Sequence, residues 1–167
     1  MPPAATMAWS WTVREEGTVS EAELEELGPI DYVVLEWPGA FPDTSEVQPL
    51  LLDLVDRGII RILDIGFVAK DENGEVTGLD VGDLKQVAAA FAEFEGASSG
   101  LLGFEDLEEA AAALEPGTSA AVLVWENRWA GPVAAAIRRS GGQLVASGRL
   151  PVQAILAALD AVEAADR

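Results

Sequence analysis

The first half of the chain alternates apolar segments with turn signals, and this pattern predicts a strand, a helix and a β-hairpin. The strand segments are rich in β-branched and aromatic side chains, whereas the helical segment has apolar side chains three and four positions apart. Gly58 ends the helix, and Asn73-Gly74 is typical of a tight hairpin turn. In chain order these predicted elements span residues 30–37, 46–57, 59–70 and 75–81.

The second half continues the alternation with more alanine in its helices. Pro116-Gly117 separates a predicted helix from a strand, Pro132 stands at the first position of the next helix, and Gly141-Gly142 ends it. Helices are predicted at 82–94, 104–114, 132–140 and 151–165, and strands at 119–125 and 143–149.

The two halves resemble each other weakly. Val33–Trp37 and Val122–Glu126 are both apolar strands with a tryptophan near the end, Trp37 in the first and Trp125 in the second, and each is followed by a loop, a helix, a glycine stop and a second strand. Two strand–helix–strand halves build a ferredoxin-like sandwich. We therefore expect an α+β fold, a ferredoxin-like sandwich of two such halves with extra helices. Many functions share this fold, so it predicts none of them.

Residues 1–27 differ from the rest of the chain because they are strongly acidic and end at Gly28-Pro29. We expect an acidic N-terminal arm over 1–27 and a single α+β domain over 28–167. Trp9 and Trp11 are separated by one residue, so both project from the same side of an extended arm. Tryptophan is enriched at binding hot spots, which makes these two candidate interface residues for docking on the chain's own domain or on a second copy.

The composition indicates a folded but very acidic protein. The chain has 167 residues, half of them hydrophobic, with 29 acidic and 10 basic side chains and a formal net charge of -19. This charge repels nucleic-acid backbones and anionic membrane surfaces, and no apolar segment approaches the length of a membrane-spanning helix. We expect a cytoplasmic protein that binds no nucleic acid and does not insert into membranes. Its expected partners are further copies of itself or a basic protein.

The absence of cysteine and histidine narrows the chemistry further. It removes thiolate nucleophiles, zinc–sulfur sites and the commonest general base. Residues 96–100 match the Gly-x-Ser-x-Gly pattern of a nucleophile elbow. The serine of such an elbow belongs to a catalytic triad that needs a histidine, and the chain has none. The same loop could hold an anion, although the neighbouring Glu95, Glu105 and Asp106 disfavour phosphate. Residues 71–75 resemble the start of a calcium loop, yet the flanking strands favour a hairpin turn. We predict no catalytic residue, cofactor or metal.

One pair of carboxylates offers an alternative. Glu36 and Glu126 each lie beside a tryptophan at the end of a first strand, so in a domain of two similar halves they could share a cleft. Trp37, Trp125 and Trp129 would supply an aromatic platform for a sugar. This alternative is a small-molecule-binding domain or a carboxylate-based enzyme.

The competing interpretation is structural. The tryptophans would then be core or interface residues, and the carboxylates would pair with Arg61, Arg128 or Arg149. Because no catalytic set is complete, we predict a non-enzymatic protein that self-associates through a sheet edge or a helix face.

Several segments together carry a resemblance to a known family. They are Gly28–Tyr32, Phe94–Leu102, Leu114–Ala120, Trp125–Asn127 and Ser140–Gly142. The chain resembles an uncharacterised family of small bacterial proteins, a domain of unknown function. That family is similar to a larger bacterial group described as membrane proteins of unknown function, whose halves flank a Gly-rich hydrophobic segment. Here the segment is reduced to about Phe94–Gly103. The resemblance covers roughly residues 28–150, supports the fold and implies no activity.

Overall fold

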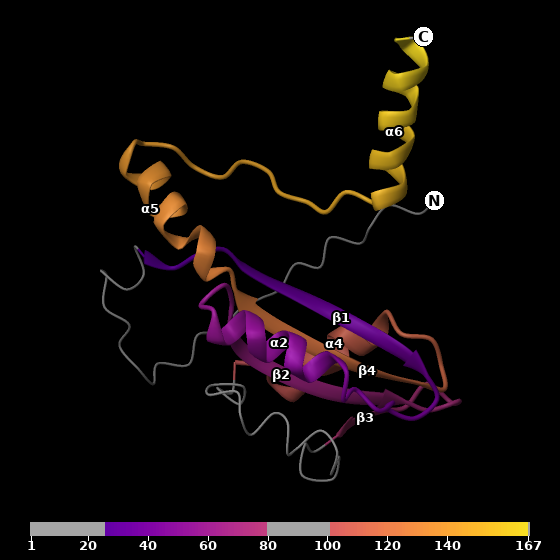
Figure 1. Cartoon of the computed structure of the whole chain (residues 1–167). Coiled ribbons are helices and arrows are strands. Elements are labelled where there is room, and N and C mark those ends of the chain that lie inside the picture. Colours follow the sequence, from indigo (N-terminus) through magenta and orange to yellow (C-terminus); the bar gives the residue numbers. More distant parts are fainter. Residues whose placement is uncertain (1–25, 80–100, 167) are drawn as a thin grey trace. The chain divides into compact units, whose positions relative to one another are not determined.

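A computed structural model describes residues 26–79 and 101–166 (Figure 1). The elements are β1 (Ile30–Pro38), α2 (Val47–Asp56), β2 (Arg61–Lys70), β3 (Val76–Leu79), α4 (Phe104–Ala112), β4 (Thr118–Glu126), a short 3₁₀ helix (Arg128–Ala130), α5 (Gly131–Arg139) and α6 (Val152–Ala165).

These elements confirm most of the local predictions, and one predicted strand is wrong. Residues 143–149 belong to an irregular segment between α5 and α6. Leu144 and Val145 are 77% and 86% exposed there, so no described element pairs with the segment or covers it. A strand needs a hydrogen-bonded neighbour as well as a suitable local sequence. The predicted helix over 82–94 lies outside the described residues.

The four strands form one antiparallel sheet in the order β1-β4-β2-β3. β4 lies in the middle and pairs with β1 along its whole length, from Ile30 opposite Glu126 to Pro38 opposite Thr118. β2 and β3 form the predicted hairpin, with Lys70 opposite Val76. The turn between them is closed by Asp71, whose Oδ1 accepts hydrogen bonds from the backbone N–H groups of Asn73 and Glu75.

The sheet lies between α2 and α4, as Figure 1 shows. Successive side chains of a strand point to opposite faces. Phe67 and Ala121 belong to the apolar cluster on the α2 face, whereas their chain neighbours Val68 and Ala120 belong to the cluster on the α4 face. Because both faces of the sheet are covered, the two central strands, β2 and β4, carry apolar side chains on both faces.

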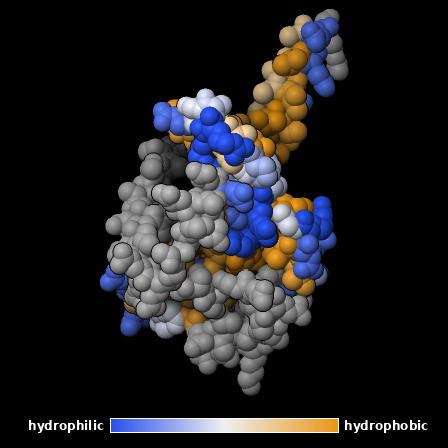
Figure 2. All heavy atoms as spheres, turned by 90° about the vertical axis from the view of Figure 1, so that its left-hand side faces the viewer, coloured by the Kyte–Doolittle hydropathy of each residue, from blue (hydrophilic) through white to orange (hydrophobic). Residues whose placement is uncertain are grey.

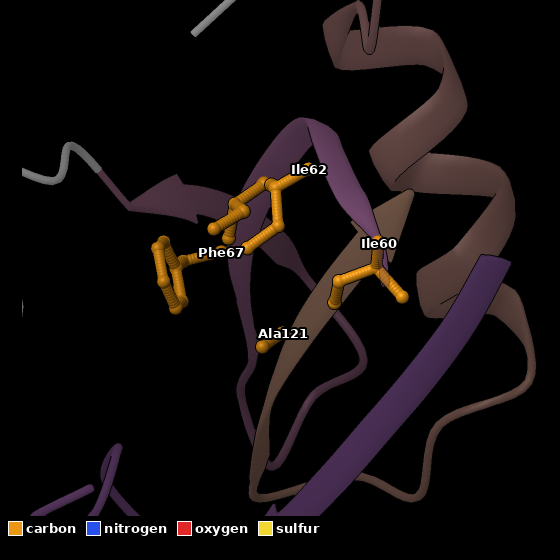
Figure 3. Packing of buried hydrophobic residues seen from close by; sticks show 5 residues of the cluster. Ile60, Ile62, Phe67 and Ala121 are labelled. Carbon is orange, nitrogen blue, oxygen red and sulfur yellow. The ribbon is translucent and has the colours of Figure 1, made fainter. Parts of the chain in front are cut away.

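The cluster under α2 is the larger of the two (Figure 3). Its buried members come from β4 and from the segment that leads into and forms β2. They are Ile60, Ile62, Ile65, Phe67 and Ala121. Trp37 and Phe41 extend it toward β1, with ring centroids 5.1 Å apart, and Phe41 lies edge-on to Phe67 at 5.0 Å. Leucine and valine side chains of α2 complete the packing, so one face of this helix anchors it to the sheet.

The cluster under α4 is built on a close approach of helix and sheet. Val68 and Ala120 meet Ala111 and Leu114 of the α4 segment. A Cβ atom built on Gly66 would lie 2.5 Å from a methyl group of Leu107, which places α4 directly over this glycine of β2. Small residues on both sides therefore set the distance between α4 and the sheet.

The α+β prediction is confirmed, whereas the ferredoxin-like sandwich is not. A ferredoxin-like sheet carries both crossover helices on one face and has its first and third strands at the centre. Here α2 and α4 pack on opposite faces, and β2 and β4 are central. Local patterns predict where strands and helices occur, but long-range contacts decide the order of the strands and the face that each helix covers.

The chain divides into two compact units, Met1–Ala135 and Ala136–Arg167. The first contains the sheet, α2 and α4, and the second contains α6. The predicted boundary between arm and domain, at residues 27 and 28, lies at the start of the described residues.

Candidate functional site

The antiparallel pairing of β1 with β4 separates the two carboxylates of the alternative prediction. Glu36 lies opposite Ala120, whereas Glu126 lies opposite Ile30. The distance along β1 from Ile30 to Glu36 is about 20 Å at roughly 3.4 Å per residue. Glu36 and Glu126 therefore lie at opposite ends of the strand pair and do not share a cleft.

Each carboxylate has its own structural contact. Glu36 is exposed, and its Oε2 accepts a hydrogen bond of 3.0 Å from the backbone N–H of Glu115, which connects β1 to the loop after α4. Glu126 is only 5% exposed, and its Oε1 lies 3.4 Å from Nε of Arg61 on the neighbouring strand. A buried carboxylate needs such a partner. The competing interpretation paired both carboxylates with arginine, and it is confirmed for Glu126, which pairs with Arg61, whereas the contact of Glu36 is the backbone N–H of Glu115.

The three candidate tryptophans do not form a platform. Trp37 and Trp125 both pack on the cluster under α2, but Trp37 lies opposite Ser119 and Trp125 lies opposite Asp31, near the two ends of β4. Trp129 belongs to the 3₁₀ helix and is 64% exposed. Two of the three therefore contribute to the core of the sheet unit.

The structure adds one residue that the sequence patterns did not single out as a site. Asn127 follows β4, and its Oδ1 accepts a hydrogen bond from Nε1 of Trp125 at 3.2 Å. Its Nδ2 donates to Oδ2 of Asp31 at 2.7 Å and to the carbonyl of Pro29 at 3.1 Å. The Asn127 backbone N–H also donates to the Pro29 carbonyl. Asn127 thus joins the end of β4 to the start of β1, and an asparagine directly after a strand was the only signal for it.

A second polar residue, Asp64, lies within the sheet and is 4% exposed. Its Oδ1 accepts a hydrogen bond from the backbone N–H of Ile65, and its Oδ2 accepts one of 2.8 Å from the N–H of Leu102. It lies at the irregularity of register between Ile62 and Asp64. Asp64 therefore attaches the segment that leads into α4 to the middle of β2, which is a structural role.

The remaining site predictions receive no placement from the structure. Trp9 and Trp11, the candidate interface residues of the arm, lie outside the described residues. Over 26–79 and 101–166, no group of three or more ligating side chains is arranged to hold a metal ion. Across the same residues, no helix is both long and apolar enough to cross a membrane.

The profile of a family of unknown function, DUF6325, matches residues 26–166. The chain belongs to this family. The DUF6325 match runs from just before β1 to the last residues of α6, so the family includes the second unit as well as the sheet. It confirms the predicted membership of a family of unknown function. Neither the curated proteins nor the solved structures contain a match.

Proposed function

We propose that this DUF6325 protein is a non-enzymatic protein that self-associates, and the exposed apolar face of α6 is the observation that carries the proposal. Five large apolar side chains of this helix are 45% to 66% exposed. They are Val152, Ile155, Leu156, Leu159 and Val162. In Figure 2, α6 is coloured as hydrophobic along most of its length.

The second unit has no core of its own, which supports the need for a partner. Every described residue from Ala136 to Asp166 is exposed. An isolated helix of α6's length, 14 residues, is marginal in water, and most helical stability in proteins comes from packing of an apolar face. A surface this apolar is typical of an interaction site. We infer that another surface covers α6 under native conditions.

The sheet unit offers further apolar surface. β1 forms one edge of the four-stranded sheet, and its residues Ile30 and Leu35 are 50% and 43% exposed. Long apolar edge strands are sites where protein chains pair. This surface supports the proposal as a second place where copies can meet.

The net charge favours an apolar contact over a charged one. Two copies at -19 each repel one another, so their contact has to be mainly apolar or bridged by arginine. Only three residues of α6 itself, Gln153, Asp160 and Glu163, have polar side chains. The face of α6 therefore combines large apolar area with little local charge.

The alternative as an enzyme or a small-molecule-binding domain receives no such support. It needed Glu36 and Glu126 in one cleft, and they lie at opposite ends of β1 and β4. Sedimentation velocity and light scattering over a wide concentration range test the proposal. We expect a mass that rises to a dimer or larger oligomer. A monomer at every concentration overturns it.

A further inference from the structure

We propose that α6 pairs in antiparallel orientation with α6 of a second copy. This inference rests on the proposed self-association and names the contact that produces it. Three features of α6 carry it: the spacing of its apolar residues, the placement of its acidic residues, and the arginine that precedes it.

The spacing of the apolar residues is that of a helix that packs on another helix. Val152, Ile155, Leu159 and Val162 follow one another at intervals of three, four and three, which is the repeat of the two core positions of a coiled coil. These four residues form an apolar seam along α6, and Leu156 widens the seam on one side. Val152 and Leu159 occupy one type of core position, and Ile155 and Val162 occupy the other. Side chains of this kind fill the holes between the side chains of a facing helix.

The acidic residues lie at the end of α6 where the helix dipole disfavours them. The first turn has no acidic residue, the last turn has no basic residue, and Asp160, Glu163 and Asp166 all lie in the C-terminal half or at the C-cap. Negative charge is favourable near a helix N-terminus and unfavourable near its C-terminus. In an isolated α6, the negative charges therefore destabilise the helix through its dipole.

An antiparallel second copy removes this conflict. It places the acidic end of each helix beside the N-terminus of the other, where the backbone N–H groups carry partial positive charge. Arg149 lies two residues before the N-cap residue Pro151, so it adds a full positive charge at the same place. A parallel pair would instead bring the two acidic C-terminal ends together, with Asp160 and Glu163 of both copies at the same end of the pair.

The same arrangement gives a self-complementary register. With a two-fold axis near the middle of the helix, Val152 faces Val162 of the second copy and Ile155 faces Leu159 of the second copy. Each of these two contacts joins one type of core position to the other, which is the pairing found in antiparallel helices. A two-fold contact of this kind uses the same surface on both copies and closes at a dimer.

Disulfide trapping tests the orientation, because the natural chain has no cysteine. We expect Val152→Cys and Val162→Cys to form few disulfide dimers separately. A mixture of the two variants should form a mixed disulfide dimer on mild oxidation. Dimers from each variant alone, with none specific to the mixture, would show a parallel pair and overturn the proposal.

Two matched variants test the seam. Leu159→Asp places a charge in the seam, whereas Ala161→Asp places the same charge on the opposite side of the helix. We expect the first to weaken the dimer by at least about tenfold and the second to have a much smaller effect. Equal effects of the two variants would overturn the assignment of the seam.

A charge reversal separates helix formation from dimer formation. Glu163→Arg puts a base at the end of α6, which favours the isolated helix. It nevertheless opposes Arg149 and the N-terminus of an antiparallel second copy, so we expect the dimer to weaken by about tenfold. Glu108→Arg, at an exposed position of α4, makes the same change of net charge and is the control. A tighter dimer for Glu163→Arg alone would contradict the antiparallel pair.

These outcomes distinguish the inference from the proposed function. A wild-type dimer that Leu159→Asp leaves intact would refute α6 as the contact and keep self-association. A wild-type chain that is monomeric at all concentrations would refute both.

Discussion

At the scale of single residues, contacts with backbone atoms explain positions that the sequence marked only as breaks. Gly28 was predicted to end the arm. In the structure, a Cβ atom built on Gly28 would overlap the carbonyl oxygen of Asn127. The entry into β1 therefore passes directly against the residue that joins β4 to β1, and no side chain can be accommodated there without a shift of backbone.

We predict that Gly28→Ala destabilises the protein, by about 1–3 kcal/mol, because this overlap with a backbone atom forces the strand entry to move. Urea unfolding followed by tryptophan fluorescence measures the change. Gly78→Ala on β3 is the matched control, since a Cβ atom there would lie 3.5 Å from the ring of Phe104, an ordinary contact. Similar unfolding midpoints for the two variants would contradict the prediction.

At the scale of elements, α4 is held to the sheet at its C-terminal end by a charged group as well as by packing. Nζ of Lys70, at the end of β2, donates hydrogen bonds to the carbonyls of Ala111 and Leu114 at 3.2 and 2.9 Å. These carbonyls lie at the end of α4, where intrahelical donors are absent and a positive charge is favourable.

We predict that Lys70→Met lowers the free energy of unfolding by about 1–2 kcal/mol, because it keeps the apolar stem and removes both hydrogen bonds. Lys70→Arg retains a charged donor and should recover part of the loss. The measurement is the midpoint of urea unfolding for the three proteins. A Lys70→Met midpoint equal to that of the natural chain would show that the contact contributes nothing.

At the scale of the whole molecule, net charge and apolar surface oppose each other. A charge of -19 per copy disfavours every association between copies, and salt screens this repulsion over a length of about 10 Å at 0.1 M. The apolar seam of α6 is insensitive to such screening.

We therefore predict that dimerisation becomes tighter as the salt concentration rises. Sedimentation equilibrium at low and high NaCl concentration measures this dependence. Weaker association at high salt would indicate a contact made mainly of ion pairs. Addition of a basic protein supplies a comparison, since salt should weaken its binding to this acidic chain.

At the candidate site, the local structure was predictable from the sequence, but the separation of Glu36 from Glu126 was not. Strands around Val33–Trp37 and Val122–Glu126 were predicted correctly, as was the partnership of Glu126 with an arginine. The resemblance between the two halves suggested that Glu36 and Glu126 would meet. Their separation follows from the direct antiparallel pairing of β1 with β4, which no local pattern specifies.

The sequence by itself determined the kinds of element, most of their boundaries, the acidic surface and the absence of cysteine and histidine chemistry. Periodicity, caps and turn residues act over a few neighbouring positions, so they can be read along the chain. Only the tertiary structure decided that β4 lies between β1 and β2, that α2 and α4 cover opposite faces, and that residues 143–149 form no strand. These features depend on contacts between residues far apart in the chain, where burial and strand pairing determine which arrangement is stable.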